Sequence, residues 1–353
     1  MGTWTRDPRE ALRAGPRFDL AKFDPDATPG FDGSKSDGEE LMLQRGELLN
    51  ELQERLYAEG RAGGSRSVLC VVQGLDTAGK GGVARHVMGM VDPQGVELRS
   101  FGVPTEEEFA NHFLWRIRKA LPRPGRIGVF DRSHYEDVLV QRVDSIVTED
   151  VWRGRYDEIN EFEKELVENG TTVLKFALMV SHDEQGIRLM ERLDRPDKRW
   201  KYSANDLKTR SKWFAYKAAY ADVFRFTSTE HAPWYVIPAN RKWFSRTAIT
   251  EILTRAMVEL DVAWPVADFD VAEQREALAA TITTPALKES LEDTEDTVES
   301  AMESSIEIRK EALELHNGDA RVEEAKTKRK EWEADLEQTL EQKRALLEAR
   351  PDA

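Results

Sequence analysis

Five short apolar segments recur along the first 260 residues, and longer segments with a helical pattern separate them. The first reads VLCVV, a continuous run typical of a strand buried on both faces of a parallel sheet. The intervening segments carry apolar residues at intervals of three and four, as amphipathic helices do. Alternation of this kind predicts a parallel sheet with helices on both faces. The predicted strands are residues 68–72, 96–101, 127–130, 171–180 and 234–237.

Capping residues, glycine and proline predict where the helices begin and end. Thr105, Ser181 and Ser203 are each followed three residues later by an acidic residue, the spacing of a capping box. Residues 1–38 are rich in Pro, Gly and Asp, and we expect an irregular arm without a chemical role. The predicted helices are residues 39–59, ending at Gly60, then 105–121, 149–169, 182–194, 203–224 and 243–260.

The composition changes beyond residue 270 to Glu, Lys, Ala and Leu, with no strand-like segment. Apolar residues recur at helical spacing on both sides of Asn317-Gly318, which predicts an acidic hairpin of two long helices over residues 271–353. A partly disordered acidic tail is the alternative. The predicted organisation is therefore an arm over 1–38, a main domain over 39–265 and the extension over 271–353.

Charge is distributed unevenly along the chain. The formal net charge of −15 argues against a nucleic-acid-binding protein with a basic surface. Residues 181–217 are nevertheless rich in Lys and Arg, a pattern that favours a polyanionic ligand. The single cysteine, Cys70, lies in the first predicted strand, where a small buried side chain is expected. Without a signal-peptide pattern or a long apolar run, we expect a cytoplasmic protein and no membrane partner.

The first predicted strand leads into GLDTAGKGG, residues 74–82. The spacing G-x-x-x-x-G-K, which ends at Lys80, is that of a P-loop, where backbone N–H groups and a helix N-terminus face a phosphate. Gly81 follows where most P-loops carry a hydroxyl that binds Mg²⁺, so Asp76 is the candidate replacement ligand. A structural turn capped by Asp76 is the alternative. The glycines expected against the phosphates are Gly74, Gly79, Gly81 and Gly82.

A second motif, FDRSHYED, follows the third predicted strand, at the sheet edge where α/β proteins bind ligands. Asp131 occupies the Walker-B position and could hold Mg²⁺ together with Asp76. Arg132 is suited to stabilise the charge of a transferring phosphoryl group. A structural ion pair at the strand end is the alternative for these two residues. His134 is expected to pack, because an ionised phosphate acceptor needs no general base.

Together these segments resemble the polyphosphate kinase 2 family, whose members move phosphoryl groups between inorganic polyphosphate and nucleotides. The resemblance runs from about residue 41 to residue 260. It implies a three-layer α/β/α P-loop kinase fold with a helical lid over about residues 182–217, Mg²⁺ as cofactor, and polyphosphate with AMP, ADP or ATP as ligands, guanine nucleotides being further candidates. The segments that carry it are GLDTAGKGG, HVMGMVDPQGV, VPTEEE, FDRSHYEDVLV, RLDRPDKRWK and APWYVIPANRKWF.

The resemblance also implies roles for individual residues. Glu136 resembles the third class of the family, which accepts both nucleoside monophosphates and diphosphates, whereas the other classes tend to have Asn. The acidic segment after residue 270 lies outside the family pattern. The expected metal ligands are Asp76 and Asp131, the expected catalytic cations are Lys80 and Arg132, and the expected polyphosphate-binding residues of the lid are Arg192, Lys198 and Lys201.

Two alternative functions remain open at this point. An ordinary nucleotide kinase could use ATP as donor on the same fold, and a P-loop switch or scaffold could bind nucleotide without transferring phosphate. Gly81 and the lack of an N-K-x-D motif weigh against a GTPase switch.

The apolar stripe of the acidic extension predicts assembly into a homo-oligomer, because two helices joined by a turn leave a seam that another surface must cover. A chain truncated near Asp270 should keep kinase activity but form a smaller assembly in light scattering. An unchanged assembly would contradict a role of the extension in the interface, and loss of catalysis in an equally assembled protein would place the extension at the active site.

Overall fold

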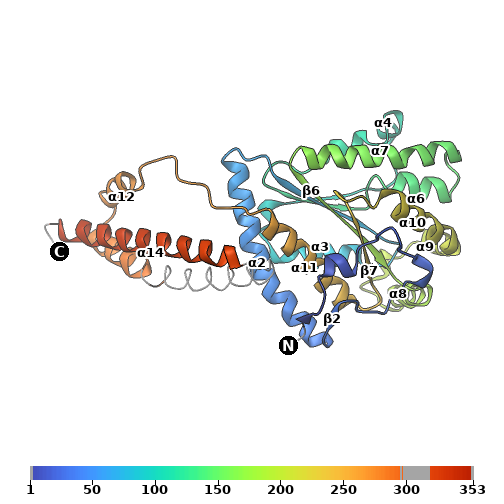
Figure 1. Cartoon of the computed structure of the whole chain (residues 1–353), viewed down its shortest axis with the longest axis horizontal. Helices are drawn as coiled ribbons and strands as arrows, with labels where there is room; N and C mark the ends of the chain where they lie inside the picture. Colours follow the sequence, from blue (N-terminus) through green and yellow to red (C-terminus); the bar gives the residue numbers. More distant parts are fainter. Residues whose placement is uncertain (1–2, 295, 297–318, 351–353) are drawn as a thin grey trace. The chain divides into compact units, whose positions relative to one another are not determined.

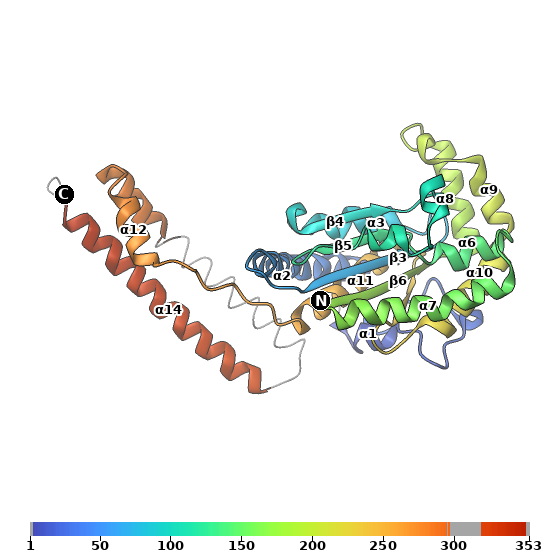
Figure 2. The ribbon, with the colours of Figure 1, turned by 90° about the horizontal axis from the view of Figure 1, so that it is seen from above.

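The structure is a computed structural model that describes residues 3–294, 296 and 319–350. The chain forms two compact units, residues 1–264 and residues 265–353. In the first unit, five parallel strands form one sheet in the order β4-β5-β3-β6-β7 (Figures 1 and 2). The predicted α/β fold with a parallel sheet is therefore confirmed. The strands are β3 (Ser67–Gln73), β4 (Val96–Ser100), β5 (Ile127–Asp131), β6 (Thr171–Met179) and β7 (Trp234–Pro238).

Helices cover both faces of this sheet. On one face α7 and α10 pack against Leu69 and Val71 of β3, and on the other face α11 packs against α2, β6 and β7 (Figure 1). All seven residues of β3 are buried, which explains the continuous apolar run in its sequence. The helices are α1 (Pro8–Ala11), α2 (Lys35–Arg61), α3 (Lys80–His86), α4 (Glu106–Ala110), α5 (Trp115–Arg118), α6 (Glu136–Val143), α7 (Glu149–Glu168), α8 (His182–Asp194), α9 (Ala204–Ser211), α10 (Trp213–Thr227) and α11 (Lys242–Glu259).

The order of the strands determines where a ligand can bind. The chain passes from β3 at the centre to β4 at the edge, comes back to β5 between these two strands, and then crosses to β6 on the other side of β3. Neighbouring connections therefore diverge at the carboxyl end of β3, where open parallel sheets bind their ligands. The register pairs Val72 with Asp131, so the P-loop and FDRSHYED begin side by side at this edge.

The N-terminal arm has more regular structure than its composition predicts. Strands β1 (Thr3–Trp4) and β2 (Phe31–Asp32) form an antiparallel pair, and residues 12–14 bind the edge of β7. There the Ala14 N–H donates to Trp234 O at 2.8 Å, and the Val236 N–H donates to Leu12 O at 2.8 Å. Elements this short have no detectable periodicity, so the sequence pattern could not predict them.

Three of the predicted helices differ from the observed ones by more than one residue. Helix α2 begins at Lys35 because Ser34 and Asp37 form a capping box, four residues before the predicted start. The predicted helix over residues 105–121 is wrong between α4 and α5, where the Asn111 side chain donates to Glu107 O at 2.8 Å and the Asn111 backbone is extended. The predicted helix over residues 203–224 is interrupted at Lys212, between α9 and α10.

The second unit contains α12 (Val271–Ala279), a helical segment over residues 284–294, and α14 (Asp319–Glu348). Polar contacts tie α14 to the earlier segments: Gln342 Nε2 donates to Ala272 O at 3.0 Å and Lys343 Nζ donates to Ser290 O at 2.9 Å. The predicted break at Asn317-Gly318 lies outside the described residues. Within the described ranges, we find no helix that combines the length and the apolar character needed to cross a bilayer.

Gly60 does not end α2, contrary to the prediction, because the helix continues to Arg61. Glycine is needed here because two backbone segments approach each other closely. A Cβ at Gly60 would lie 2.5 Å from the Cα of Gly125 and 2.8 Å from the carbonyl oxygen of Pro124. Backbone atoms cannot yield as a flexible side chain can. This helix therefore contacts the turn before β5 backbone to backbone.

We expect Gly60→Ala to lower the free energy of unfolding by about 1–3 kcal/mol, because the added methyl group overpacks this contact. The matched control is Gly154→Ala in α7, where a Cβ meets nothing within 4 Å and the alanine should stabilise the helix by up to ~1 kcal/mol. Urea unfolding of both variants measures the difference. Equal stability of the two would contradict the close approach.

Candidate active site

The P-loop follows directly from the end of β3. Gly79 has φ of +120° and precedes α3, whose first residue is Lys80. Lys80 Nζ donates to Gly74 O at 2.6 Å and to Leu75 O at 3.4 Å, so its side chain folds back across the loop. A Cβ at Gly81 would meet nothing within 4 Å, which leaves open space on this side of the loop. Such a bare backbone surface suits the approach of a phosphate.

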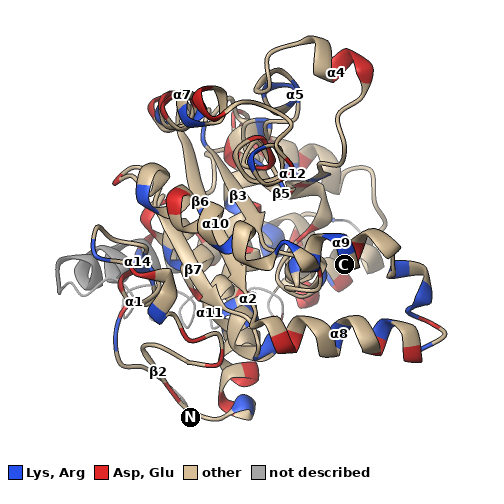
Figure 3. Cartoon of the chain, turned by 90° about the vertical axis from the view of Figure 1, so that its right-hand side faces the viewer, with Lys and Arg blue, Asp and Glu red and all other residues tan. Residues whose placement is uncertain are grey.

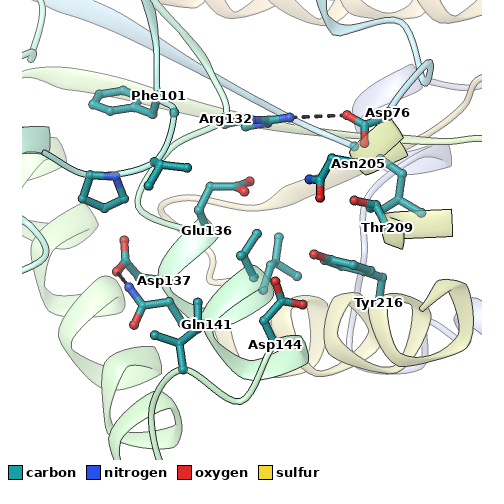
Figure 4. A pocket seen from close by; sticks show the side chains of 18 of the residues that line it. Asp76, Phe101, Arg132, Glu136, Asp137, Gln141, Asp144, Asn205, Thr209 and Tyr216 are labelled. Atoms are coloured by element: carbon teal, nitrogen blue, oxygen red, sulfur yellow. Dashed lines mark hydrogen bonds and ion pairs between the residues drawn. The ribbon is translucent and has the colours of Figure 1, made fainter. Parts of the chain in front are cut away.

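Arg132 and Asp76 bring the two motifs together. Arg132 has φ of +64°, an uncommon conformation outside glycine, and its N–H donates to Val72 O at 3.1 Å. Its guanidinium Nη2 lies 3.3 Å from Asp76 Oδ1 (Figure 4). Thr77 in the P-loop also has a positive φ, +65°. Backbone strain of this kind is concentrated at functional sites. Two of the four described non-glycine residues with positive φ, Thr77 and Arg132, lie in the predicted site, and the other two, Ser145 and Asp261, lie outside it.

Charged groups of both signs share this site. Burial lowers the pKa of Lys80, and Arg132 lowers it further, while Asp131 and Asp76 act in the opposite direction. Burial also opposes the charge on Arg132, but Glu136, Asp76 and Asp131 outweigh it and raise the pKa of Arg132. The predicted catalytic residues therefore lie close enough to influence one another electrostatically.

A cavity of about 480 Å³ opens beside these residues (Figure 4). Its walls come from the P-loop, the segment after β4, helix α6, helix α9 and helix α10. From α10, Tyr216 and Tyr220 are buried and both line this cavity, whereas Phe214 is 81% exposed. Polar side chains in the wall include Glu136, Asp137, Gln141, Asp144, Asn205 and Thr209.

Glu136 points into the cavity from the first turn of α6 (Figure 4). Burial raises the pKa of Glu136, although Arg132 and Lys80 partly offset this. Gln73, at the end of β3, contacts it: with the amide oriented by the surrounding hydrogen bonds, Nε2 donates to Glu136 Oε1 at 3.0 Å and Oε1 accepts from the Ser133 N–H at 3.1 Å. The sequence pattern did not single out Gln73, nor did it predict α6.

The three predicted lid cations do not line the cavity. Arg192 Nη1 donates to Lys201 O at 3.0 Å and to Asp206 Oδ2 at 3.3 Å, whereas Lys198 Nζ pairs with Glu191 Oε1 at 2.5 Å. Lys201 stacks over the ring of Trp200 at 4.9 Å. Basic and acidic residues alternate along α8 (Figure 3), and both of its cations are paired within the lid itself, Arg188 with Glu184 and Arg192 with Asp206.

Arg188 in α8 is a further site residue that the sequence did not distinguish from its basic neighbours. It is 5% exposed, and it donates to Thr77 O at 2.9 Å and to Ala239 O at 2.6 Å. One turn earlier, Gln185 Nε2 donates to Asp76 O at 3.2 Å. The base of α8 is thus tied to the P-loop backbone, which fixes the loop where the lid begins.

The acidic residues suit a metal ion shared with a ligand. Within the described part of the chain, no group of three or more His, Cys, Asp or Glu could hold a metal alone. Mg²⁺, however, commonly uses one or two carboxylates and takes its other ligands from waters and phosphates. Asp76 and Asp131 supply two such carboxylates beside the P-loop, so the residues fit a metal that binds together with a phosphate.

A P-loop, a Walker-B acid and an adjacent arginine at the open edge of a parallel sheet define a P-loop phosphotransferase. The family model described as "Polyphosphate kinase 2 (PPK2)" matches residues 32–263. The chain belongs to the polyphosphate kinase 2 family. Phosphotransferases of this kind generally need a divalent metal.

Similar proteins cover most of the first unit. An AMP/ADP-polyphosphate phosphotransferase of Meiothermus ruber is 48% identical over 249 residues, covering 70% of this chain and 92% of the relative. An ADP-polyphosphate phosphotransferase of Rhodopseudomonas palustris is 40% identical over 263 residues, covering 71% and 89%. The crystal structure of polyphosphate kinase 2 from Arthrobacter aurescens TC1 has a TM-score of 0.77 at 49% identity, covering 79% of this chain and 99% of that one.

The raised pKa of Glu136 predicts a pH dependence. The carboxylate takes up its proton at a higher pH than an ordinary glutamate, so a reaction that needs it ionised should lose rate as the pH falls toward that raised pKa. We expect Glu136→Gln to be slower and to lack this acidic limb in kcat/KM for AMP between about pH 5 and 8. Glu107→Gln, an exposed position in α4, is the control and should keep the limb. An identical acidic limb in Glu136→Gln would assign it to another group.

Proposed function

We propose that this protein transfers a phosphoryl group from inorganic polyphosphate to AMP and to ADP, reversibly and with Mg²⁺. The observation that carries the proposal is the meeting of the P-loop with Asp131 and Arg132 at one sheet edge, beside a cavity of about 480 Å³. The relative from Meiothermus ruber, 48% identical, is named for both acceptors. Glu136, which faces the cavity, supports the choice of acceptor, because a carboxylate there could act on the nucleotide phosphates through a metal-bound water, the bridge that two anions need.

The residues divide the work of phosphoryl transfer by charge. Asp76 and Asp131 would hold Mg²⁺, which when bound neutralises phosphate oxygens and orients them. Lys80 reaches the outer phosphates as a point charge, and Arg132 binds two oxygens of the transferring group. The P-loop backbone around Gly79, Gly81 and Gly82 positions the phosphates in line, and this positioning supplies much of the rate enhancement.

No general base is needed, because the acceptor oxygen of AMP or ADP is already ionised at neutral pH. His134 is 0% exposed and its Nε2 lies 3.2 Å from Glu163 Oε1, which supports a packing role. Exclusion of water matters more, since water would compete as the acceptor. Helices α8 and α9 carry this function, with Asn205 and Thr209 already in the cavity wall.

Polyphosphate occupies a separate path along the lid. Arg192, Lys198 and Lys201 lie outside the cavity, which leaves that cavity to the nucleotide. A polyanion would have to displace Glu191 to bind Lys198. Lys201 is exposed, and a polyanion could bind it without displacing a carboxylate. Assembly into a homo-oligomer and a cytoplasmic location stay predictions.

Incubation of the protein with polyphosphate, Mg²⁺ and AMP, without ATP, tests the function. We expect ADP and then ATP to form, and Asp76→Asn and Asp131→Asn to abolish turnover without unfolding the chain, because neither amide replaces the lost metal-binding charge. An ATP-dependent nucleotide kinase would form no product without ATP, and a scaffold would form none with either donor. Near-normal turnover of Asp76→Asn would remove Asp76 from the metal site.

A further inference from the structure

A group of charged and polar side chains closed to solvent includes the second and third residues after Arg132. Glu163 comes from α7, Lys175 from β6, and His134 and Tyr135 from the segment between β5 and α6. All four are 0% exposed. None of them lines the cavity, so none contacts a substrate there. A lysine in the middle of a buried strand needs an explanation, because burial of a charge is costly unless the charge is paired.

The hydrogen bonds of this cluster are complete around the ammonium group. Lys175 Nζ donates to Glu163 Oε2 at 2.5 Å, to Tyr135 Oη at 2.9 Å and to Thr227 O at 2.7 Å, which uses its three donors. Tyr135 Oη in turn donates to Glu163 Oε1 at 2.8 Å. Burial opposes ionisation of Glu163, but Lys175 and His134 outweigh it and lower the pKa of Glu163. Burial also lowers the pKa of Lys175, although Glu163 acts in the opposite direction. The three hydrogen bonds of Lys175 Nζ nevertheless hold the pair in one geometry.

Stability alone is a weak reason for such a cluster. A buried ion pair is often no more stabilising than apolar residues of the same volume, because both charges must leave water. The pair does, however, fix the positions of the side chains that are hydrogen-bonded to it. Its bonds end on His134 and Tyr135, the second and third residues after Arg132.

The segment that contains His134 and Tyr135 begins with a residue in a strained backbone conformation. Arg132 has φ of +64°, a conformation that persists only where the surroundings determine it fully. On one side the Arg132 N–H donates to Val72 O, and Gln73 Oε1 accepts from the Ser133 N–H. On the other side the buried cluster fixes Tyr135. The backbone that aims the Arg132 guanidinium is thus held at both ends.

We propose that the Lys175–Glu163 pair, acting through Tyr135, is a positioning device that holds Arg132 in its strained conformation and aims its guanidinium at the transferring phosphoryl group. The proposal rests on the proposed function, because it requires Arg132 to act on that group. Lys175, Glu163 and Tyr135 are positioning residues and contact no substrate.

The first test is Tyr135→Phe, which removes one hydroxyl without a change of charge. We expect kcat to fall about tenfold or more, while KM for polyphosphate and for AMP changes little, because a misplaced Arg132 loses its contact chiefly in the transition state. The matched control is Tyr156→Phe, which removes a buried hydroxyl bonded to Arg142 at 3.3 Å. It should keep the kcat of the unchanged protein. Unchanged kcat in Tyr135→Phe, or an equal loss in both variants, would overturn the proposal.

A second variant separates positioning from stability. In Lys175→Met with Glu163→Leu both charges are replaced by apolar groups of similar size, so the double variant should unfold at a higher temperature than either single variant, which leaves one charge buried and unpaired. We expect its kcat to remain about tenfold or more below that of the unchanged protein. Full kcat in this double variant would show that the cluster acts only as core.

The third test asks whether the cluster acts through Arg132. We expect Tyr135→Phe to lower kcat much less in an Arg132→Lys background, because two residues that serve one contact are not additive. An equal loss in both backgrounds would overturn the proposal. Full activity of Arg132→Lys alone would instead remove Arg132 from the proposed mechanism, and the Tyr135→Phe result would then have to be assigned elsewhere, which overturns the positioning role as well.

Discussion

The parallel pairing of β3 with β5 is the constraint on which the site depends. Val72 pairs with Asp131, and the Val72 carbonyl also accepts the N–H of Arg132. The P-loop leaves one strand where FDRSHYED leaves the other, so a shift of the register would separate the metal-binding acids from the phosphate cradle. Because side chains alternate along a strand, a shift of a single residue would also turn Asp131 toward the opposite face.

The charges of the site hold one another in place before any ligand binds. Asp76 is paired with Arg132, and Lys80 folds back onto backbone carbonyls of its own loop. Polyphosphate and nucleotide would substitute their phosphates for these internal partners, so binding exchanges one set of polar contacts for another. This exchange limits the cost of keeping several like charges close together, because none of them loses its partner without gaining another.

The sequence predicted those features of the fold and the site that are marked by a periodic pattern or a known motif. The strands, the capping residues Thr105, Ser181 and Ser203, and the polyphosphate kinase 2 family were all legible in the sequence. The sequence pattern could not show why α2 continues past Gly60, because this glycine is needed for a close contact with Gly125, which is distant in the sequence. It likewise could not distinguish Arg188 from other lid cations, or show that Lys175 meets Glu163, since both facts depend on tertiary contacts.

The two edges of the sheet are finished in different ways. At β7, residues 12–14 occupy the free hydrogen-bonding groups, so no further strand can add there. At β4 the edge carries exposed positions, including Leu98 at 59% exposure, and relies on its charged residues Glu97 and Arg99 to discourage pairing with another chain. Removal of the N-terminal arm would therefore do more than shorten the protein: it would leave two open edges on one sheet, the condition under which strand-to-strand aggregation begins.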